Sequence, residues 1–177
     1  AVKSNAAQVW NYELVDGDRK TDGRSTGDVA FHLSAIYDGR TSYVLYDSVL
    51  TLNQRKEVTS GEVRLATRTS FSASGWSYKT LEPTSQVNPV LGFDVALGKS
   101  AAGISAAWLS STSSSLPKAN SVHWQLISKA STIYSINTDA FGKPAAGIST
   151  DGSSIAFSCE KRICSVDTSK GAPRLLF

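Results

Sequence analysis

The sequence predicts an all-β protein, mostly antiparallel, folded as a sandwich or a barrel-like stack of sheets with little helix. Short segments in which apolar and polar residues alternate recur along the chain, and Gly, Asp, Asn and Pro separate them. No segment shows a convincing helical pattern. A length of 177 residues fits one domain, and 41% hydrophobic residues suffice for an ordinary core.

The first predicted strand covers residues 8–15. Trp10, Tyr12 and Leu14 share one side of it, opposite a second set of alternating residues. This pattern is typical of a half-buried strand.

A polar loop rich in Asp-Gly signals is expected over residues 16–23, directly after that strand. Asp16, Asp18 and Asp22 have the spacing of oxygen ligands in a calcium loop. Lys20, however, stands where such a loop needs an oxygen ligand, so a solvated hairpin loop is the favoured interpretation.

Two longer strands are expected at residues 29–37 and 42–52, joined through Asp38-Gly39-Arg40-Thr41. Asp-Gly between apolar segments is a strong signal for a hairpin. Within the first of these strands His32 alternates with Phe31 and Leu33, so we expect it to face away from them.

A strand at residues 62–71 is expected to carry Arg64 and Arg68 on one side. Together with Trp76 and Tyr78, these residues form a candidate binding surface, basic enough for nucleic acid. The competing interpretation is the solvent-exposed side of an antiparallel sheet. A carbohydrate platform is a further alternative, built from four aromatic residues: Trp76, Tyr78, Trp108 and Trp124.

Residues 82–89 are a candidate connection within the single domain 1–177, separating an N-terminal hairpin region from two repeat-like units at 90–132 and 133–177. The units are suggested by an internal repeat of 44 residues, in which eight of ten positions of 96–105 recur at 140–149. A duplication predicts that both copies form a turn at Gly-Lys and then a short strand. It also predicts that Ile104 and Ile148 are buried on matching faces.

Strands are also expected at residues 122–127 and 133–137, followed by a hairpin of 154–158 with 163–166. A turn at Lys161-Arg162 would place Cys159 directly opposite Cys164, where a disulfide is geometrically allowed. Two reduced, partly buried thiols are the alternative. Two cysteines without a nearby His supply too few ligands for a metal site.

The end of the chain resembles a known repeat. Asp151-Gly152, then an Ile-Ala-Phe strand, a Val-Asp strand and a Gly-Ala-Pro-Arg turn make residues 133–177 similar to a blade of TolB-like propellers of the WD40 type. That resemblance implies a four-stranded blade. The same residues also resemble the C-terminal sheet of minor pilins and pseudopilins, since a strand ends in Phe-Gly-Lys-Pro and a hairpin carries a late cysteine pair.

Catalytic motifs are absent from the sequence: there is no Gly-x-Ser-x-Gly, no Gly-x-Gly-x-x-Gly and no phosphate-binding Gly-Lys-Ser loop in its full form. His32 and His123 are the two imidazoles, and neither stands in a catalytic context. We therefore expect no catalytic residue, no cofactor and no metal.

The expected function is that of a non-enzymatic structural protein that assembles with copies of itself or with other proteins into a filament, shell, capsid or surface assembly. Low charge and Ser/Thr-rich strands favour this function, because strand edges with few charged side chains can pair with the strands of a neighbouring molecule. The alternatives are a module that binds carbohydrate or nucleic acid and, less favoured, a secreted hydrolase. No membrane span is expected, and an extracytoplasmic, virion or surface location is slightly favoured over others.

Overall fold

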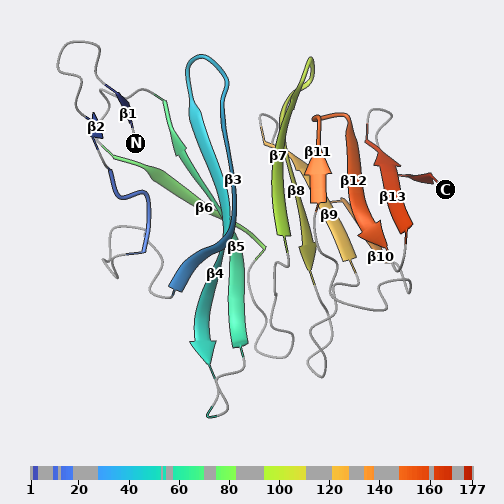
Figure 1. Ribbon diagram of the computed structural model, residues 1–177, viewed down its shortest axis with the longest axis horizontal. Helices are drawn as coiled ribbons and strands as arrows, with labels where there is room; N and C mark the ends of the chain where they lie inside the picture. The colour runs from blue at the N-terminus through green and yellow to red at the C-terminus, as the bar shows by residue number, and fades with distance from the viewer. Residues whose placement is uncertain are drawn as a thin grey trace.

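A computed structural model gives the fold of the chain (Figure 1). The residues that it describes are 2–3, 10–11, 13–17, 28–52, 54, 58–69, 75–82, 94–110, 121–127, 134–137, 148–159, 162–168 and 174–176. These residues contain strands and turns and no helix, so the predicted all-β fold is confirmed. Accordingly, no helix in this part of the chain could cross a membrane.

Three four-stranded antiparallel sheets follow one another along the chain, and each is a simple meander. We call them the first sheet (β3–β6), the middle sheet (β7–β10) and the third sheet (β11–β14). A separate short pair, β1 with β2, lies near the N-terminus. The strands are β1 Val2–Lys3, β2 Trp10–Asn11, β3 Asp28–Tyr37, β4 Ser42–Leu52, β5 Val58–Arg68, β6 Ser77–Glu82, β7 Asp94–Ser100, β8 Gly103–Ser110, β9 Ser121–Leu126, β10 Tyr134–Asn137, β11 Ile148–Thr150, β12 Ser154–Cys159, β13 Arg162–Asp167 and β14 Arg174–Leu176.

The sheets stack side by side, and the middle sheet lies between the other two (Figure 1). The first strand of each sheet faces the first strand of the next: β3 contacts β7, and β7 contacts β11. One hydrogen bond joins the first two of these strands, because Ser34 Oγ accepts from the backbone N–H of Leu97 at 3.0 Å. At the end where each first hairpin turns, Lys99 Nζ donates to the carbonyl oxygen of Asp38 at 3.0 Å.

Side chains on a strand alternate between its two faces, and both faces of the middle sheet are apolar. One face packs against the first sheet, with Trp108 fully buried at its centre. The members of this cluster are Leu45, Val63, Leu65, Leu81, Val95, Leu97, Ile104, Ala106 and Trp108. The first two sheets therefore share one continuous core.

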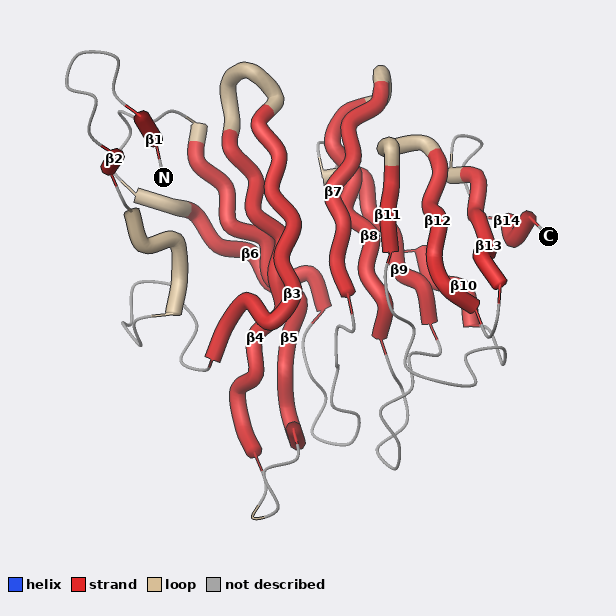
Figure 2. Tube along the Cα trace, viewed as in Figure 1, coloured by secondary structure: helices blue, strands red, loops and turns tan. Residues whose placement is uncertain are grey.

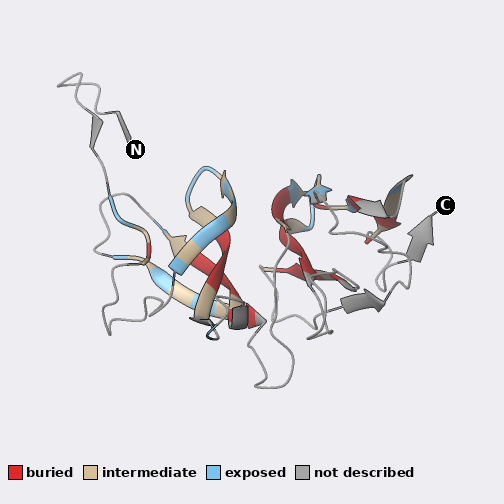
Figure 3. Ribbon diagram, turned by 60° about the horizontal axis from the view of Figure 1, so that its bottom comes forward, coloured by how far each residue is buried: buried red, intermediate tan, exposed pale blue. Residues whose placement is uncertain are grey.

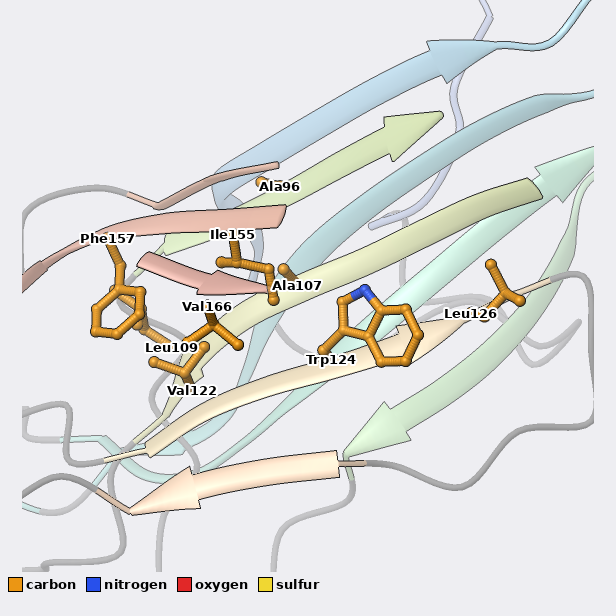
Figure 4. Close-up of a cluster of buried hydrophobic side chains, with 9 residues drawn as sticks. All are labelled: Ala96, Ala107, Leu109, Val122, Trp124, Leu126, Ile155, Phe157 and Val166. Atoms are coloured by element: carbon orange, nitrogen blue, oxygen red, sulfur yellow. The ribbon is translucent and has the colours of Figure 1, made fainter. Parts of the chain in front are cut away.

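The opposite face of the middle sheet packs against the third sheet (Figure 4). The third sheet contributes three buried side chains to this second cluster, namely Ile155 and Phe157 of β12 and Val166 of β13. The middle sheet supplies Ala96, Ala107, Leu109, Val122, Trp124 and Leu126. Because consecutive residues such as Ala106 and Ala107 enter different clusters, one strand connects both cores.

Two glycines bring the middle and third sheets into backbone contact. A Cβ on Gly98 of β7 would lie 2.7 Å from the carbonyl oxygen of Thr150 and 2.8 Å from the carbonyl carbon of Asp151. A Cβ on Gly152 would lie 2.6 Å from the backbone nitrogen of Ser100. Real Cβ atoms do not approach backbone so closely, so only glycine fits at either position.

The first hairpin turns of the first and third sheets have the same construction and lie at the same end of the stack (Figure 2). Asp38 Oδ1 accepts hydrogen bonds from the backbone N–H groups of the second and third residues after it, and Asp151 Oδ1 does the same. The glycine that follows each aspartate has a positive φ, 103° at Gly39 and 94° at Gly152. The hairpin predicted at Asp38-Gly39 is therefore present, and it has a counterpart in the third sheet.

The predicted strand at residues 8–15 is wrong in its extent. Among the described residues only Trp10–Asn11 is a strand in this region, and Glu13–Gly17 has no strand pairing. This segment instead crosses the first sheet, where the Tyr78 hydroxyl donates to the carbonyl oxygen of Val15 at 2.6 Å. Side-chain contacts hold it there in place of a ladder of backbone hydrogen bonds.

The two copies of the internal repeat do not occupy equivalent places. Gly98 and Lys99 lie inside β7, the turn follows at Ala101-Ala102, and Ile104 belongs to the second strand of its sheet. Ile148 belongs to the first strand of the third sheet. Ile104 is buried, whereas the side chain of Ile148 lies outside the described residues. The expected turn at Gly-Lys is wrong for the first copy, because Gly98 and Lys99 pair with Ser105 and Ile104 in the β7–β8 ladder. The corresponding Gly142-Lys143 lies outside the described residues.

The division into sheets differs from the expected units in one place. The first sheet ends at Glu82 and the next begins at Asp94, which brackets the expected connection at 82–89. However, β10 pairs with β9, so the middle sheet extends to Asn137 and past the expected division between 132 and 133. The pairing of Ile136 with Val122 continues the meander there.

Candidate functional site on the first sheet

The residues of the predicted binding surface lie on one face of the first sheet, the face away from the middle sheet, which we call the outer face. Arg64 and Arg68 lie on β5, and the pairing of Ala66 with Tyr78 places Tyr78 on the same face. Trp76 directly precedes β6 and is half-buried. The sheet therefore brings Arg64, Arg68 and Tyr78 together on the outer face.

Both arginines of the predicted basic surface form ion pairs within the chain. Arg64 is buried, its Nε lies 3.3 Å from Asp16 Oδ2, and its second ion pair joins its guanidinium to Glu62 Oε1 at 2.6 Å. Arg68 forms an ion pair with Glu13. Two guanidinium groups thus face three carboxylates, so this face carries no excess positive charge to attract a polyanion.

A buried polar cluster of Asp16, Tyr46, Arg64 and Glu62 fixes the segment Glu13–Gly17 on the outer face. The Tyr46 hydroxyl donates to Asp16 Oδ2, and Thr80 Oγ1 donates to Glu62 Oε2 at 2.9 Å. Burial, and then the hydrogen bond to Asp16, raise the pKa of Tyr46 well above its usual range. Every polar group of the cluster has a partner, so its role is to hold the segment in place.

Tyr78 also helps to hold the segment Glu13–Gly17 on the outer face. Its hydroxyl donates to the carbonyl oxygen of Val15 at 2.6 Å, and the Arg64 guanidinium lies 5.7 Å from the centre of its ring. The ring therefore takes part in a cation–π contact and an anchoring hydrogen bond.

Two of the four aromatic residues proposed as a carbohydrate platform are interior. Trp108 and Trp124 are buried in the cores on opposite faces of the middle sheet, which corrects this alternative. The rings of Trp108 and His123 stack, with centroids 5.5 Å apart and an interplanar angle of 10°. His123 therefore packs against the core through its ring.

The second imidazole forms a pair with a carboxylate. His32 Nδ1 lies 2.9 Å from Asp47 Oδ2, and the backbone N–H of His32 donates to Asp47 Oδ1 at 2.9 Å. Asp47 is buried, and the nearby Ala30 has a φ of 63° within an irregularity of the β3–β4 register. A carboxylate that orients an imidazole is two-thirds of a catalytic triad. Among the described residues, no hydroxyl or thiol hydrogen-bonds His32.

Metal binding finds no support in the described residues. Asp16 of the predicted loop is buried and bonded to Arg64 and Tyr46, and Asp18 and Asp22 lie outside the described residues. No group of three potential His, Cys, Asp or Glu ligands occurs in this part of the chain.

The cysteines lie in the hairpin of β12 and β13. Cys164 is disulfide-bonded, and Cys159 is the only other cysteine of the chain. The predicted turn position is wrong, because Cys159 pairs with Arg162 and Phe157 lies opposite Cys164. This register puts Ile155 beside Val166 and Phe157 beside Cys164, so all four face the core.

Sequence reasoning did not identify a strip of exposed apolar side chains on the first sheet. Along β3, Phe31, Leu33 and Tyr37 have 65%, 59% and 54% of their surface exposed. Leu33 pairs with Tyr46 and Tyr37 with Ser42, so both belong to the outer face. The signal in the sequence is that polar residues occupy the inward-facing positions of this part of the strand. His32 contacts Asp47, and Ser34 accepts from the backbone of Leu97. Their apolar neighbours Phe31 and Leu33 therefore face outward.

No protein-family model matches the chain significantly, and neither does any curated protein or solved structure.

Proposed function

We propose that the chain is a non-enzymatic structural module that works through protein–protein association, and that the outer face of the first sheet is its contact surface. The observation that carries this proposal is the exposure of Leu33, Phe31 and Tyr37 along β3. Figure 3 colours the chain by burial, and pale-blue exposed segments are visible on the sheet nearer the N-terminus. Exposed apolar side chains gathered in this way mark interaction sites more often than isolated ones do.

The arrangement of the sheets supports the same proposal. The middle sheet is covered on both faces, and each end sheet is covered by another sheet on one face alone, among the described residues. The segment Glu13–Gly17 lies over β4–β6, and its last residue also contacts Val29 at the start of β3. Farther along β3, Phe31, Leu33 and Tyr37 remain exposed. Residues 29–37 contain no Asp, Glu, Lys or Arg, so the exposed strip along β3 carries no formal charge.

We also propose that the three sheets are consecutive blades of a propeller-type array. Three features support this: each sheet is a four-stranded meander, the first strands of successive sheets lie next to each other, and the third sheet carries the Asp-Gly turn of the resembled blade. Rings of this kind contain about four to eight blades, so the three sheets of the described residues leave two end faces without a neighbouring blade.

Size-exclusion chromatography with light scattering tests the proposed contact surface. We expect the wild-type chain to associate as its concentration rises, and Leu33→Glu to remain monomeric, because a buried carboxylate without a partner is costly. Ser77→Glu is the matched control, since it adds the same charge at an exposed position of β6. A wild-type chain that stays monomeric and also retains no protein partner through the Leu33 surface would refute the proposal.

A further inference from the structure

The same turn occurs twice in this chain, once docked and once open. In the third sheet, the turn at Gly152 packs against β7, and a Cβ there would lie 2.6 Å from Ser100 N and 2.7 Å from the carbonyl carbon of Lys99. In the first sheet, a Cβ on Gly39 would meet nothing within 4 Å. Both turns have the same aspartate hydrogen bonds and a similar positive φ at glycine. The turn of the first sheet is contacted by Lys99 of β7 through the carbonyl oxygen of Asp38, but among the described residues no sheet packs against its Gly39.

The strand register extends this equivalence to a whole face. Tyr37 pairs with Ser42 across the first turn, as Thr150 pairs with Ile155 across the second, so each turn closes a loop of equal length. Ile155 belongs to the face that the third sheet buries against the middle sheet. Its counterpart Ser42 belongs to the outer face of the first sheet, where Leu33 and Tyr37 are exposed.

The outer face of the third sheet has the features of a receiving surface. The middle sheet admits the Gly152 turn because its first two strands carry small residues there, such as Gly98, Ala96 and Ala107. The outer face of the third sheet likewise carries small, exposed residues on its first two strands, namely Ser149, Ser154 and Ala156.

The third strand of that sheet adds an apolar contact. Ser165 pairs with Ala156, so Ile163, two residues away on β13, shares the same face. Ile163 has 85% of its surface exposed. The largest exposed apolar side chain of the third sheet and the exposed strip of the first sheet therefore lie on the two faces that no described sheet covers.

We infer that a second copy of this chain covers both faces: the third sheet of one copy receives the first sheet of the other, repeating the contact between the middle and third sheets. Two copies supply six four-stranded sheets, a number within the range of closed rings. A head-to-tail contact that closes leaves no free face and stops at a defined size. This inference rests on the proposed function and names the partner for it.

Variants on both faces test the inference by light scattering. We expect the wild-type chain to form dimers and no larger species. Gly39→Ala and Ala156→Glu are each expected to weaken dimerisation on the order of tenfold or more, since the first places a Cβ at the docked turn and the second a charge on the receiving face. Gly75→Ala is the control for the turn: its φ is 96° and its Cβ meets nothing within 4 Å, so dimerisation should be unchanged. Circular dichroism and thermal melting confirm that each variant is folded.

Each other outcome overturns the inference in a recognisable way. If Leu33→Glu abolishes association and Ala156→Glu does not, the first sheet meets a surface other than the third sheet, and the proposed function stands without this partner. Oligomers that grow with concentration contradict the closed pair. A wild-type chain that stays monomeric removes the second copy as the occupant, and the proposed function then depends on whether a partner binds through Leu33.

Discussion

The contact between Gly98 and the turn at Gly152 should be the most sensitive point of the stack. In Gly98→Ala the added methyl group would lie 2.7 Å from Thr150 O and 2.8 Å from Asp151 C. Ordinary contacts begin about 0.6 Å farther out, and the opposing atoms are backbone, so the third sheet itself must move. Overpacking of this kind costs about 1–3 kcal/mol or more, a large part of the roughly 5–15 kcal/mol by which domains are stable.

Urea unfolding followed by tryptophan fluorescence and circular dichroism measures this cost as a change in the free energy of unfolding. Gly152→Ala and Gly75→Ala form a matched pair, because their φ angles are 94° and 96° and only the first position is packed. The difference between these two variants isolates the packing contribution from backbone strain. If Gly98→Ala is as stable as the wild-type chain within about 0.5 kcal/mol, the close contact of the two sheets is refuted.

Three further predictions concern the core and the titrating groups. Trp108→Ala should lower the free energy of unfolding by about 3–5 kcal/mol in urea, because it empties the centre of the core between the first and middle sheets. The backbone N–H of Ser153, and then that of Ser154, lower the pKa of Asp151 below its ordinary 3.8, so its ionised form stabilises the fold above about pH 4 and this contribution is lost as the pH falls. Asp151→Asn should therefore flatten the acid limb of a thermal-melting profile, and an unchanged slope would contradict the turn geometry. Burial raises the pKa of Tyr46 above its ordinary 10.0, so stability should fall as the pH rises past 10, and Tyr46→Phe should weaken that alkaline dependence.

Local sequence patterns are sufficient to predict strands in which apolar and polar residues alternate regularly. Residues 42–52 were expected as one strand, and β4 has those bounds. The Asp-Gly hairpin was also foreseen, because the turn chemistry of Asp38 and Gly39 is contained within four residues. Such features depend on residues that are close in sequence, so they can be predicted without knowledge of tertiary contacts.

The features that the sequence could not supply depend on residues far apart in the chain. Arg64 was expected on a basic surface, and its partner Asp16 lies 48 positions earlier in an irregular segment that had been expected to end a strand. Likewise, Gly98 is an ordinary strand glycine until Gly152 of the next sheet is placed against it. The conspicuous repeat at residues 96–105 and 140–149 misled for the same reason, since the structurally repeated element is the pair of Asp-Gly turns.

The proposal that the outer face of the first sheet is an association surface is tested most directly by hydroxyl-radical footprinting at low and high protein concentration. Phe31 and Tyr37 are exposed in the single chain, and Tyr43 lies half-buried on the opposite face of the same sheet. If association covers the outer face, labelling of Phe31 and Tyr37 falls as the concentration rises, and labelling of Tyr43 stays constant. Labelling of Phe31 and Tyr37 that remains unchanged in the associated protein would contradict the proposal.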